Sequence, residues 1–213
     1  MKQALVSLIV LFALTAGTYP DNKPEFSYKV YGNVANYFEN EKDLLSFFEF
    51  KKGDVVGEIG ANNGQNIAGL SLLTDSIAFY AEDINSKTLN QKNFDKAIAK
   101  CAKFRISKTN TYKLQIGTEK ETLLPDNSFD KIILSSTFHE FTFMDEMLSD
   151  IYKKLKPGGK LFILESYCSN KDHRNYTSEQ TGILLQKHNF RFLKKDGKDL
   201  NGATGLYRMI SVK

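Results

Sequence analysis

The chain has 213 residues, of which 41% are hydrophobic, and its formal net charge is +4. This length and composition indicate one globular domain that is large enough to bury its own core. The basic excess is spread over scattered pairs such as Lys51-Lys52 and Lys194-Lys195, without a run of five or six like charges. Because nucleic-acid-binding chains concentrate their basic residues on one face, no nucleic-acid partner is expected.

The N-terminus differs in composition from the rest of the chain. Lys2 precedes an apolar run from Ala4 to Leu14, and small residues from Thr15 to Thr18 follow it. A basic start, an apolar core of about 7–15 residues and a small-residue exit are typical of a secretory signal peptide. We therefore expect residues 1–18 to direct export to the periplasm or the medium. No stable membrane span is expected, because a spanning helix needs about 20 apolar residues. A buried N-terminal helix in a cytoplasmic protein is the alternative.

The following elements alternate between helix and strand. Residues 19–30 are expected to form an extended lead-in, because Pro20 and Pro24 oppose an early helix. Hydrophobic periodicity then predicts, in chain order, a helix at 40–48, a strand at 55–59, a helix at 67–73, a strand at 77–81, a helix at 86–100, strands at 112–116 and 131–135, a helix at 143–155, a strand at 160–165, a helix at 177–188 and strands at 190–195 and 206–212. The last helix begins with the spacing of a capping box, Thr177 to Gln180.

This order predicts a three-layer α/β sandwich with a Rossmann-like, mostly parallel sheet of seven strands that ends in a C-terminal antiparallel hairpin. Right-handed crossovers place the carboxyl ends of the parallel strands on one edge. The residues that end the strands are therefore expected to meet there: 58–64, Glu82-Asp83, 117–119, 135–140 and Glu165-Ser166.

The turn after the first strand narrows the choice of ligand. Gly60 and Gly64 are four residues apart and Asn62 lies between them, so the turn has neither the Gly-x-Gly-x-x-Gly fingerprint nor a P-loop. The carboxylate of Glu58 would repel a phosphate group and attract a cation. The turn thus favours a positively charged or neutral nucleoside-like ligand, although an ordinary strand–helix turn has the same pattern.

Four segments, in this order, resemble the motifs of class I S-adenosylmethionine-dependent methyltransferases, and the resemblance runs from about residue 40 to the end. Residues 58–64 resemble the acidic, glycine-rich first motif, and residues 82–85 resemble the acidic end of the second strand. Residues 124–140 resemble the fourth-strand region, and residues 155–161 resemble the turn before the fifth strand.

The resemblance implies a methyltransferase domain at 40–213, with residues 19–39 as a lid over the substrate pocket and S-adenosyl-L-methionine as cofactor. Asp83 is expected to accept hydrogen bonds from the ribose hydroxyls. Glu82 is the alternative, because strand alternation lets only one of the two point inward. Thr118 or Glu119 would flank the adenine, and Ser135 would lie beside the reactive methyl. The expected cofactor contacts are Glu58, Gly60, Asn62, Gly64, Asp83, Thr118, Glu119 and Ser135.

His139 is the candidate catalytic base, because the unperturbed pKa of histidine lies near neutral pH. A structural histidine at a strand–helix junction is the alternative. A base is needed only if the acceptor carries a proton of high pKa, since methyl transfer mainly requires alignment. Cys101 and Cys168 match no metal-binding spacing, so no metal is expected. The sequence predicts a methyltransferase with a small-molecule acceptor; the alternative is an exported, non-catalytic protein that keeps the fold as a binding module.

Overall fold

The computed structural model describes residues 47–71, 74–102, 109–167, 176–198 and 205–213. The predictions for the export signal, for the lid at 19–39 and for most of the helix at 40–48 lie outside the described residues, as does Cys168. Within the described part of the chain, no helix is both long enough and apolar enough to cross a membrane.

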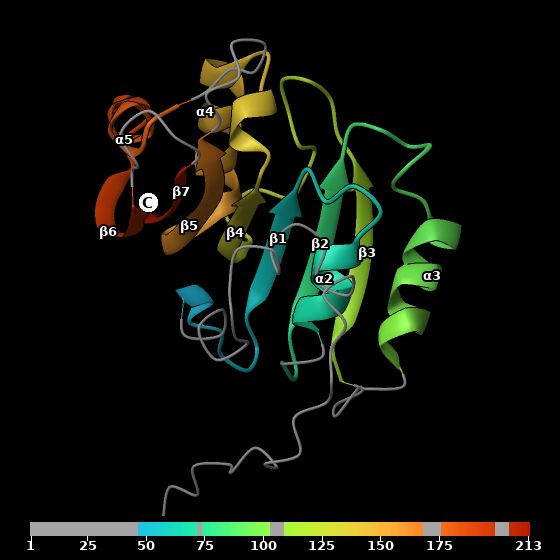
Figure 1. Cartoon of the computed structure of the whole chain (residues 1–213). Helices are drawn as coiled ribbons and strands as arrows, with labels where there is room; N and C mark the ends of the chain where they lie inside the picture. The colour runs from blue at the N-terminus through green and yellow to red at the C-terminus, as the bar shows by residue number, and fades with distance from the viewer. Residues whose placement is uncertain (1–46, 72–73, 103–108, 168–175, 199–204) are drawn as a thin grey trace, which may run out of the picture.

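A single sheet runs through the molecule in the order β3-β2-β1-β4-β5-β7-β6 (Figure 1). β1 to β5 are parallel, while β7 is antiparallel to both β5 and β6. The predicted Rossmann-like sheet with a C-terminal antiparallel hairpin is therefore confirmed. The strands are β1 (Val55–Ile59), β2 (Ala78–Asp83), β3 (Thr111–Ile116), β4 (Phe129–Ser135), β5 (Leu155–Tyr167), β6 (Arg191–Lys198) and β7 (Gly205–Val212).

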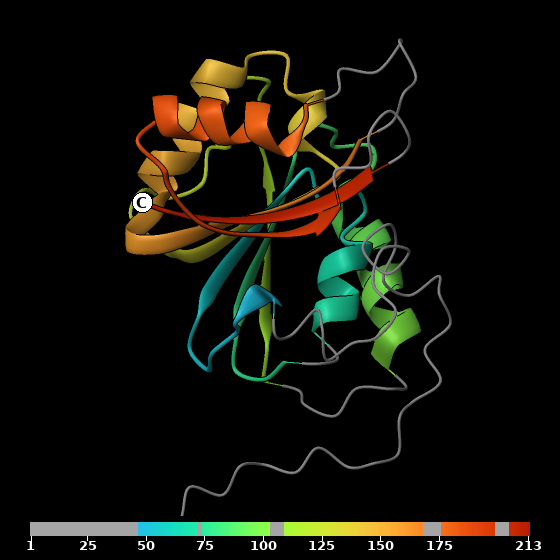
Figure 2. The same ribbon diagram turned by 60° about the vertical axis from the view of Figure 1, so that its left-hand side comes forward.

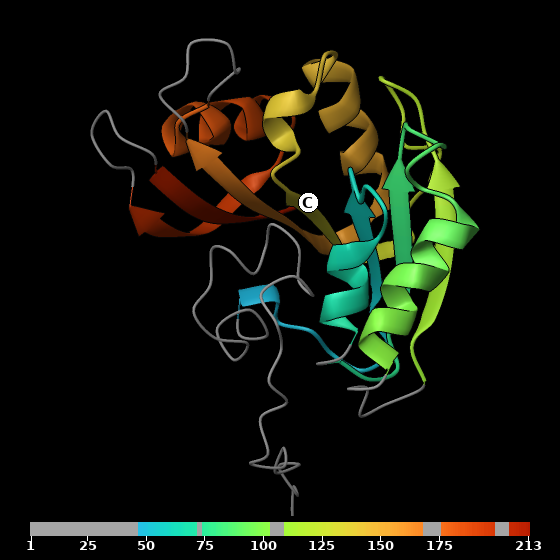
Figure 3. The same ribbon diagram turned by 45° about the vertical axis from the view of Figure 1, so that its right-hand side comes forward.

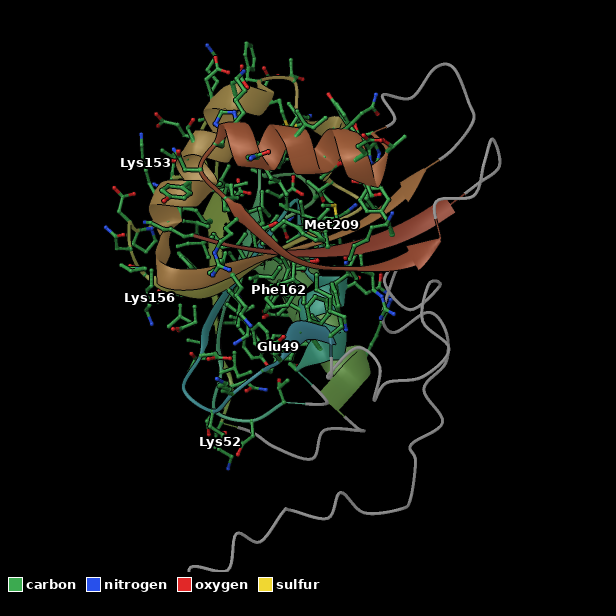
Figure 4. All side chains as sticks on the ribbon, turned by 90° about the vertical axis from the view of Figure 1, so that its left-hand side faces the viewer. Glu49, Lys52, Lys153, Lys156, Phe162 and Met209 are labelled. Atoms are coloured by element: carbon green, nitrogen blue, oxygen red, sulfur yellow. The ribbon has the colours of Figure 1, made fainter. Side chains whose placement is uncertain are left out.

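Helices cover both faces of the sheet and complete the three layers. Viewed along the sheet, α2 (Gln65–Leu70) and α3 (Gln91–Ala102) lie on one side, and α4 (Met144–Lys154) and α5 (Ser178–Lys187) lie on the other (Figure 2). Turning the molecule the other way brings α2 and α3 in front of the sheet (Figure 3). Phe162 and Met209 mark the two hydrophobic cores, which lie on opposite faces of the sheet (Figure 4).

The predicted starts of two helices are wrong by more than one residue. The helix predicted at 86–100 begins at Gln91. The side-chain oxygen of Asn85 accepts a hydrogen bond from the backbone N–H of Lys87 at 3.1 Å, and that of Asn90 accepts one from Asn93 at 3.0 Å. Asparagine side chains that bond to nearby backbone in this way favour turns and helix starts, so the helix begins after Asn90. The helix predicted at 67–73 begins at Gln65.

The predicted capping box of α5 is confirmed. The hydroxyl of Thr177 accepts a hydrogen bond from the backbone N–H of Gln180, and the side chain of Gln180 accepts one from the backbone N–H of Thr177. These bonds satisfy two backbone donors that the first turn of a helix leaves without partners. The start of α5 is therefore determined locally.

Candidate active site

A cavity of about 340 Å³ opens at the carboxyl edge of the sheet, between the loops that follow β1, β2, β3 and β4. These loops gather at the upper edge of the sheet in Figure 1. A second pocket of about 210 Å³ adjoins the first across the turn after β1. Gly60, Asn62 and Ser136 line both pockets, so the turn separates two compartments of one cleft.

The turn after β1 needs glycine at two positions. Gly60 has a φ of 72°, and a Cβ there would lie 2.4 Å from Cγ2 of Thr137, in the loop after β4. Gly64 has a φ of 77°, and a Cβ there would lie 2.2 Å from the ring of Phe94. Asn62, also left-handed with a φ of 52°, occupies a conformation that asparagine tolerates. The two glycines therefore let the turn pack closely, Gly60 against the loop after β4 and Gly64 against α3. Of the two, Gly60 lines the cleft and Gly64 does not.

Glu58 lies at the end of β1 with only 1% of its surface exposed. Its Oε1 accepts a hydrogen bond from Nδ2 of Asn66 at 2.9 Å, and Asn66 lines the smaller pocket. Its Oε2 has no hydrogen-bond partner among the described residues. Burial, opposed by the bond from Asn66, raises the pKa of Glu58 to about 7. A cation in the cleft would stabilise the ionised form and supply the missing partner.

Both acidic residues at the end of β2 line the larger cavity, so the expectation that only one of them points inward is wrong. Asp83 is the last residue of β2, where the regular alternation of the strand ends. Its Oδ2 accepts a hydrogen bond from the N–H of Asn62 and its Oδ1 accepts one from Asn85, each at 2.8 Å. Asp83 thus ties the loop after β2 to the turn after β1, and each of its oxygens retains capacity for a second bond.

Thr118 and Glu119 line the cavity from the loop after β3, as expected. Their side chains differ in how readily a ligand could bind them. The hydroxyl of Thr118 is engaged in its own turn, where it accepts hydrogen bonds from the N–H groups of Glu121 at 3.0 Å and Lys120 at 3.2 Å. Glu119 is exposed at the rim of the cavity. Of these two side chains, Glu119 is therefore the one that a ligand can reach without opening the turn.

A buried carboxylate on α4 holds this loop in place. Oδ2 of Asp150 accepts hydrogen bonds from the backbone N–H of Thr122 at 2.9 Å and from its hydroxyl at 2.7 Å. Oδ1 of Asp150 lies 3.1 Å from Nζ of Lys154. Asp150 is 6% exposed and Thr122 is fully buried. The position of the loop after β3 therefore depends on α4.

The cleft presents buried polar atoms that lack partners. The hydroxyls of Ser135 and Ser136, which line the smaller pocket, have no hydrogen-bond partner among the described residues, and neither do Oε2 of Glu58 and Oε1 of Glu82. Buried polar atoms are normally paired, so several orphans around one cleft indicate a polar ligand. Among the described residues, no cluster of three His, Cys, Asp or Glu side chains could hold a metal ion.

His139 lies in the short 3₁₀ helix η2 (Phe138–Glu140), between β4 and α4. Its Nδ1 is 2.8 Å from Oε1 of Glu165, a buried residue near the end of β5, and its Nε2 is 3.0 Å from Oε1 of Glu140. The bond to Glu165, opposed by burial, raises the pKa of His139. His139 does not line the larger cavity, whereas its neighbour Glu140 does. The imidazole therefore lies beside the cleft, held between two carboxylates.

Sequence reasoning missed several residues that line or support the cleft. Ile84, Phe141 and Met147 supply apolar surface to the larger cavity, and Asn66 contacts Glu58 in the smaller pocket. The position of Ile84, directly after the acidic end of β2, is a signal that could have identified it. The other three have no local signal, because chain folding alone brings α2, α4 and the segment after Glu140 to the cleft.

Comparisons with known proteins agree with this geometry. Residues 58–163 match a family model described as a methyltransferase domain. The chain is 26% identical over 156 residues to the ubiquinone/menaquinone biosynthesis C-methyltransferase of Francisella tularensis, covering 64% of this chain and 57% of that protein. It is 31% identical over 147 residues to the protein of the same name from Wigglesworthia glossinidia brevipalpis, with the same coverage. The chain thus spans somewhat more than half the length of these relatives.

Solved structures show the same fold. A SAM-dependent methyltransferase from Aquifex aeolicus superimposes with a TM-score of 0.66 at 17% identity, covering 87% of this chain and 91% of that one. Phosphoethanolamine N-methyltransferase 2 of Haemonchus contortus, solved with S-adenosylhomocysteine, gives a TM-score of 0.61 at 16% identity, covering 80% of this chain and 51% of that one.

The fold and the cleft define a nucleoside-binding α/β protein of the Rossmann-like class. Residues 58–163 form a class I S-adenosylmethionine-dependent methyltransferase domain, a family whose methyl donor is S-adenosyl-L-methionine. The resemblance seen in its four sequence motifs is therefore confirmed.

Proposed function

We propose that this methyltransferase transfers the methyl group to a carbon atom of a small molecule, and that His139 removes a proton from that acceptor. The observation that carries the proposal is the His139–Glu165 pair beside the cleft, 2.8 Å between Nδ1 and Oε1. A buried carboxylate bound to one ring nitrogen orients the imidazole and stabilises its protonated form. The relatives named C-methyltransferases support the choice of a small molecule and of a carbon acceptor.

The cofactor would lie across the turn after β1. The backbone of Gly60 and Asn62 lines both pockets, and Glu58 with Asn66 would face the positively charged part of the cofactor in the smaller pocket. The nucleoside part would occupy the larger cavity, between Asp83 and Glu119. When bound, S-adenosylmethionine supplies a methyl group on a positively charged sulfur. The protein's own contribution is then alignment of the acceptor and exclusion of water.

His139 can act as a base only when one ring nitrogen is available to the acceptor. The Glu165 side chain is only 1% exposed, so its hydrogen bond to Nδ1 is buried and stays in place. Glu140 is 66% exposed at its side chain, so its contact with Nε2 is screened by water and weak. We therefore assign the exchangeable position to Nε2, where an acceptor would replace Glu140.

Incubating the purified chain with S-adenosylmethionine carrying a labelled methyl group and a small-molecule extract of the host tests the proposal. Mass spectrometry should find the label on a carbon atom of a product of low molecular mass. Replacing His139 with Asn should slow this transfer by about 100-fold or more. His188→Asn is the matched control, because His188 pairs with Asp145 away from the cleft. The proposal would be contradicted if the labelled methyl group were found on protein or on no product. Equal rates of methyl transfer for His139→Asn and His188→Asn would also contradict it.

A further inference from the structure

One edge of the sheet and the helix beside it expose apolar side chains to solvent. β6 is the last strand of the sheet, and α5 packs next to it (Figure 1). Ile183 of α5 and Phe192 of β6 are 62% and 51% exposed, and both line a groove of about 600 Å³ between these two elements. Leu193, the next residue of β6, is also exposed. Because apolar side chains that gather at a surface mark contacts with other molecules, this region is a candidate docking surface.

The same region carries positive charge. Arg191, Lys194 and Lys195 belong to a stretch of β6, residues 191–195, in which every residue is exposed. Within the described part of the chain, no ion pair involves Arg191 or Lys194. Among the described residues that line the groove, Glu179 is the one carboxylate. The α5–β6 face, which we define as Ile183 together with residues 191–195, therefore combines apolar side chains with a net positive charge.

The basic side chains lie on both faces of the sheet. Lys195 pairs in register with Met209, which belongs to the core on the α5 side, and Lys194 pairs with Ile210, which belongs to the core on the α3 side. Paired residues of neighbouring strands point to the same face. Phe192 lies on the α5 side, where it lines the groove. A flat partner that meets the sheet at its edge would contact both faces at once, whereas a peptide in the groove would reach only one of them.

Another β-strand is a poor partner for this edge. The pairing of β6 with β7 shifts register between Phe192 and Lys194, so β6 is irregular where a further strand would have to pair. Bulges and lysines on edge strands oppose such pairing. A second copy of the chain, joined symmetrically through β6, would also bring the basic residues of the two copies against one another. The charge and the shape of the edge thus favour a flat, anionic partner.

We propose that the α5–β6 face docks the protein on a membrane surface that contains anionic lipids. The three apolar side chains of the face enter the boundary between head groups and acyl chains, and the three basic ones face the lipid phosphates. Apolar burial and electrostatic attraction act together in binding of this kind. The cleft lies at the carboxyl edge of β1 to β4, and β5 and β7 separate it from β6. Docking leaves the cleft accessible and is independent of the methyl transfer proposed above.

Co-sedimentation of the full chain with lipid vesicles tests the proposal. Vesicles of phosphatidylcholine with about one third phosphatidylglycerol should bind the wild-type chain about 10-fold or more tighter than vesicles of phosphatidylcholine alone. Arg191→Gln combined with Lys194→Gln should weaken binding to the anionic vesicles by about 10- to 30-fold. Lys92→Gln combined with Lys96→Gln is the matched control. These exposed lysines lie on α3, near the opposite edge of the sheet, so the control should bind like the wild-type chain.

A second variant separates the apolar contribution from the charge. Ile183→Ala combined with Phe192→Thr should bind the anionic vesicles about 10-fold more weakly and still prefer them to neutral ones. Its thermal unfolding should resemble that of the wild-type chain, because both side chains are largely exposed. Equal affinity of the wild-type chain for the two kinds of vesicle overturns the proposal, as does a charge variant that binds as tightly as the α3 control. Binding to polyglutamate without binding to vesicles would also overturn it and would assign the face to an acidic protein.

Discussion

Nδ1 of His139 lies 2.8 Å from Oε1 of Glu165, which joins a residue of the loop after β4 to one near the end of β5. The backbone N–H of His139 also donates to Oε2 of the same carboxylate at 3.3 Å. Both oxygens of Glu165 thus hold one residue, which fixes the ring and the backbone of η2 together. This arrangement makes Glu165 a positioning residue for His139.

Glu165→Gln should lower the pKa of His139, because the carboxylate bonded to Nδ1 is the largest cause that raises it. Nitrogen chemical shifts of the imidazole, followed by NMR across a pH titration, measure this value directly. Glu140→Gln is the comparison and should have the smaller effect, since Glu140 is largely exposed. An unchanged His139 titration in Glu165→Gln would show that the pair does not form in solution.

The free energy of unfolding of the ligand-free chain should fall as the pH rises from about 5 to about 8. Burial raises the pKa of Glu82 to about 8 from 4.5, so between these values the folded chain holds a proton that the unfolded chain has lost. Stability then decreases with pH, on the order of 4 kcal/mol for this group at about 1.4 kcal/mol per pKa unit. Glu58, whose pKa burial raises to about 7, adds a smaller decrease in the free energy of unfolding over the same pH range.

Glu82→Gln should therefore flatten this pH dependence, because the amide has no proton to lose. Denaturant titrations at pH 5 and pH 8 give the two free energies for each protein. Glu179→Gln, on the exposed face of α5, serves as the control and should keep the wild-type slope. A Glu82→Gln slope as steep as that of the wild-type chain would mean that Glu82 is ionised in the fold.

Asp150→Ala should lower the free energy of unfolding by about 2 kcal/mol, because it removes the buried acceptor of Thr122 and one of the two carboxylates that pair with Lys154. It should also weaken the binding of S-adenosylhomocysteine, since the loop that Asp150 anchors carries Glu119. Glu146→Ala on the same helix removes a half-exposed carboxylate and should change stability by no more than about 0.5 kcal/mol. Equal effects of the two variants would rule out the anchoring role.

The architecture was predictable because its signals are local and repeated. Val55–Ile59 reads as an apolar strand and forms β1 over the same residues. The start of α3 was not predictable from periodicity, because the side chains of Asn85 and Asn90 compete for the backbone there. Tertiary structure, rather than strand alternation, decides that both Glu82 and Asp83 face the cleft.

The turn and loops of the cleft were more predictable than the surroundings of His139, the candidate base. Gly60, Gly64 and Asp83 belong to short segments in which residue type follows from backbone geometry. His139 was identified by its chemistry alone, and its partner Glu165 is 26 residues away in the chain. That pairing becomes visible only when β4 and β5 lie side by side.

We predict that residues 1–18 are removed during export, because their composition follows the pattern of a signal peptide. Fractionation of the host followed by mass spectrometry of the N-terminus measures cleavage and compartment together. A mature chain that begins near Tyr19 in an exported fraction is the expected result. An intact N-terminus in the cytoplasmic fraction would contradict it.

A crystal structure of the chain with S-adenosylhomocysteine tests the central claim most directly. The account predicts the nucleoside in the 340 Å³ cavity beside Glu82 and Asp83, and the amino-acid part across Gly60 in the 210 Å³ pocket near Glu58. A ligand bound elsewhere on the molecule, or crystals in which a saturating concentration leaves this cleft empty, would contradict it.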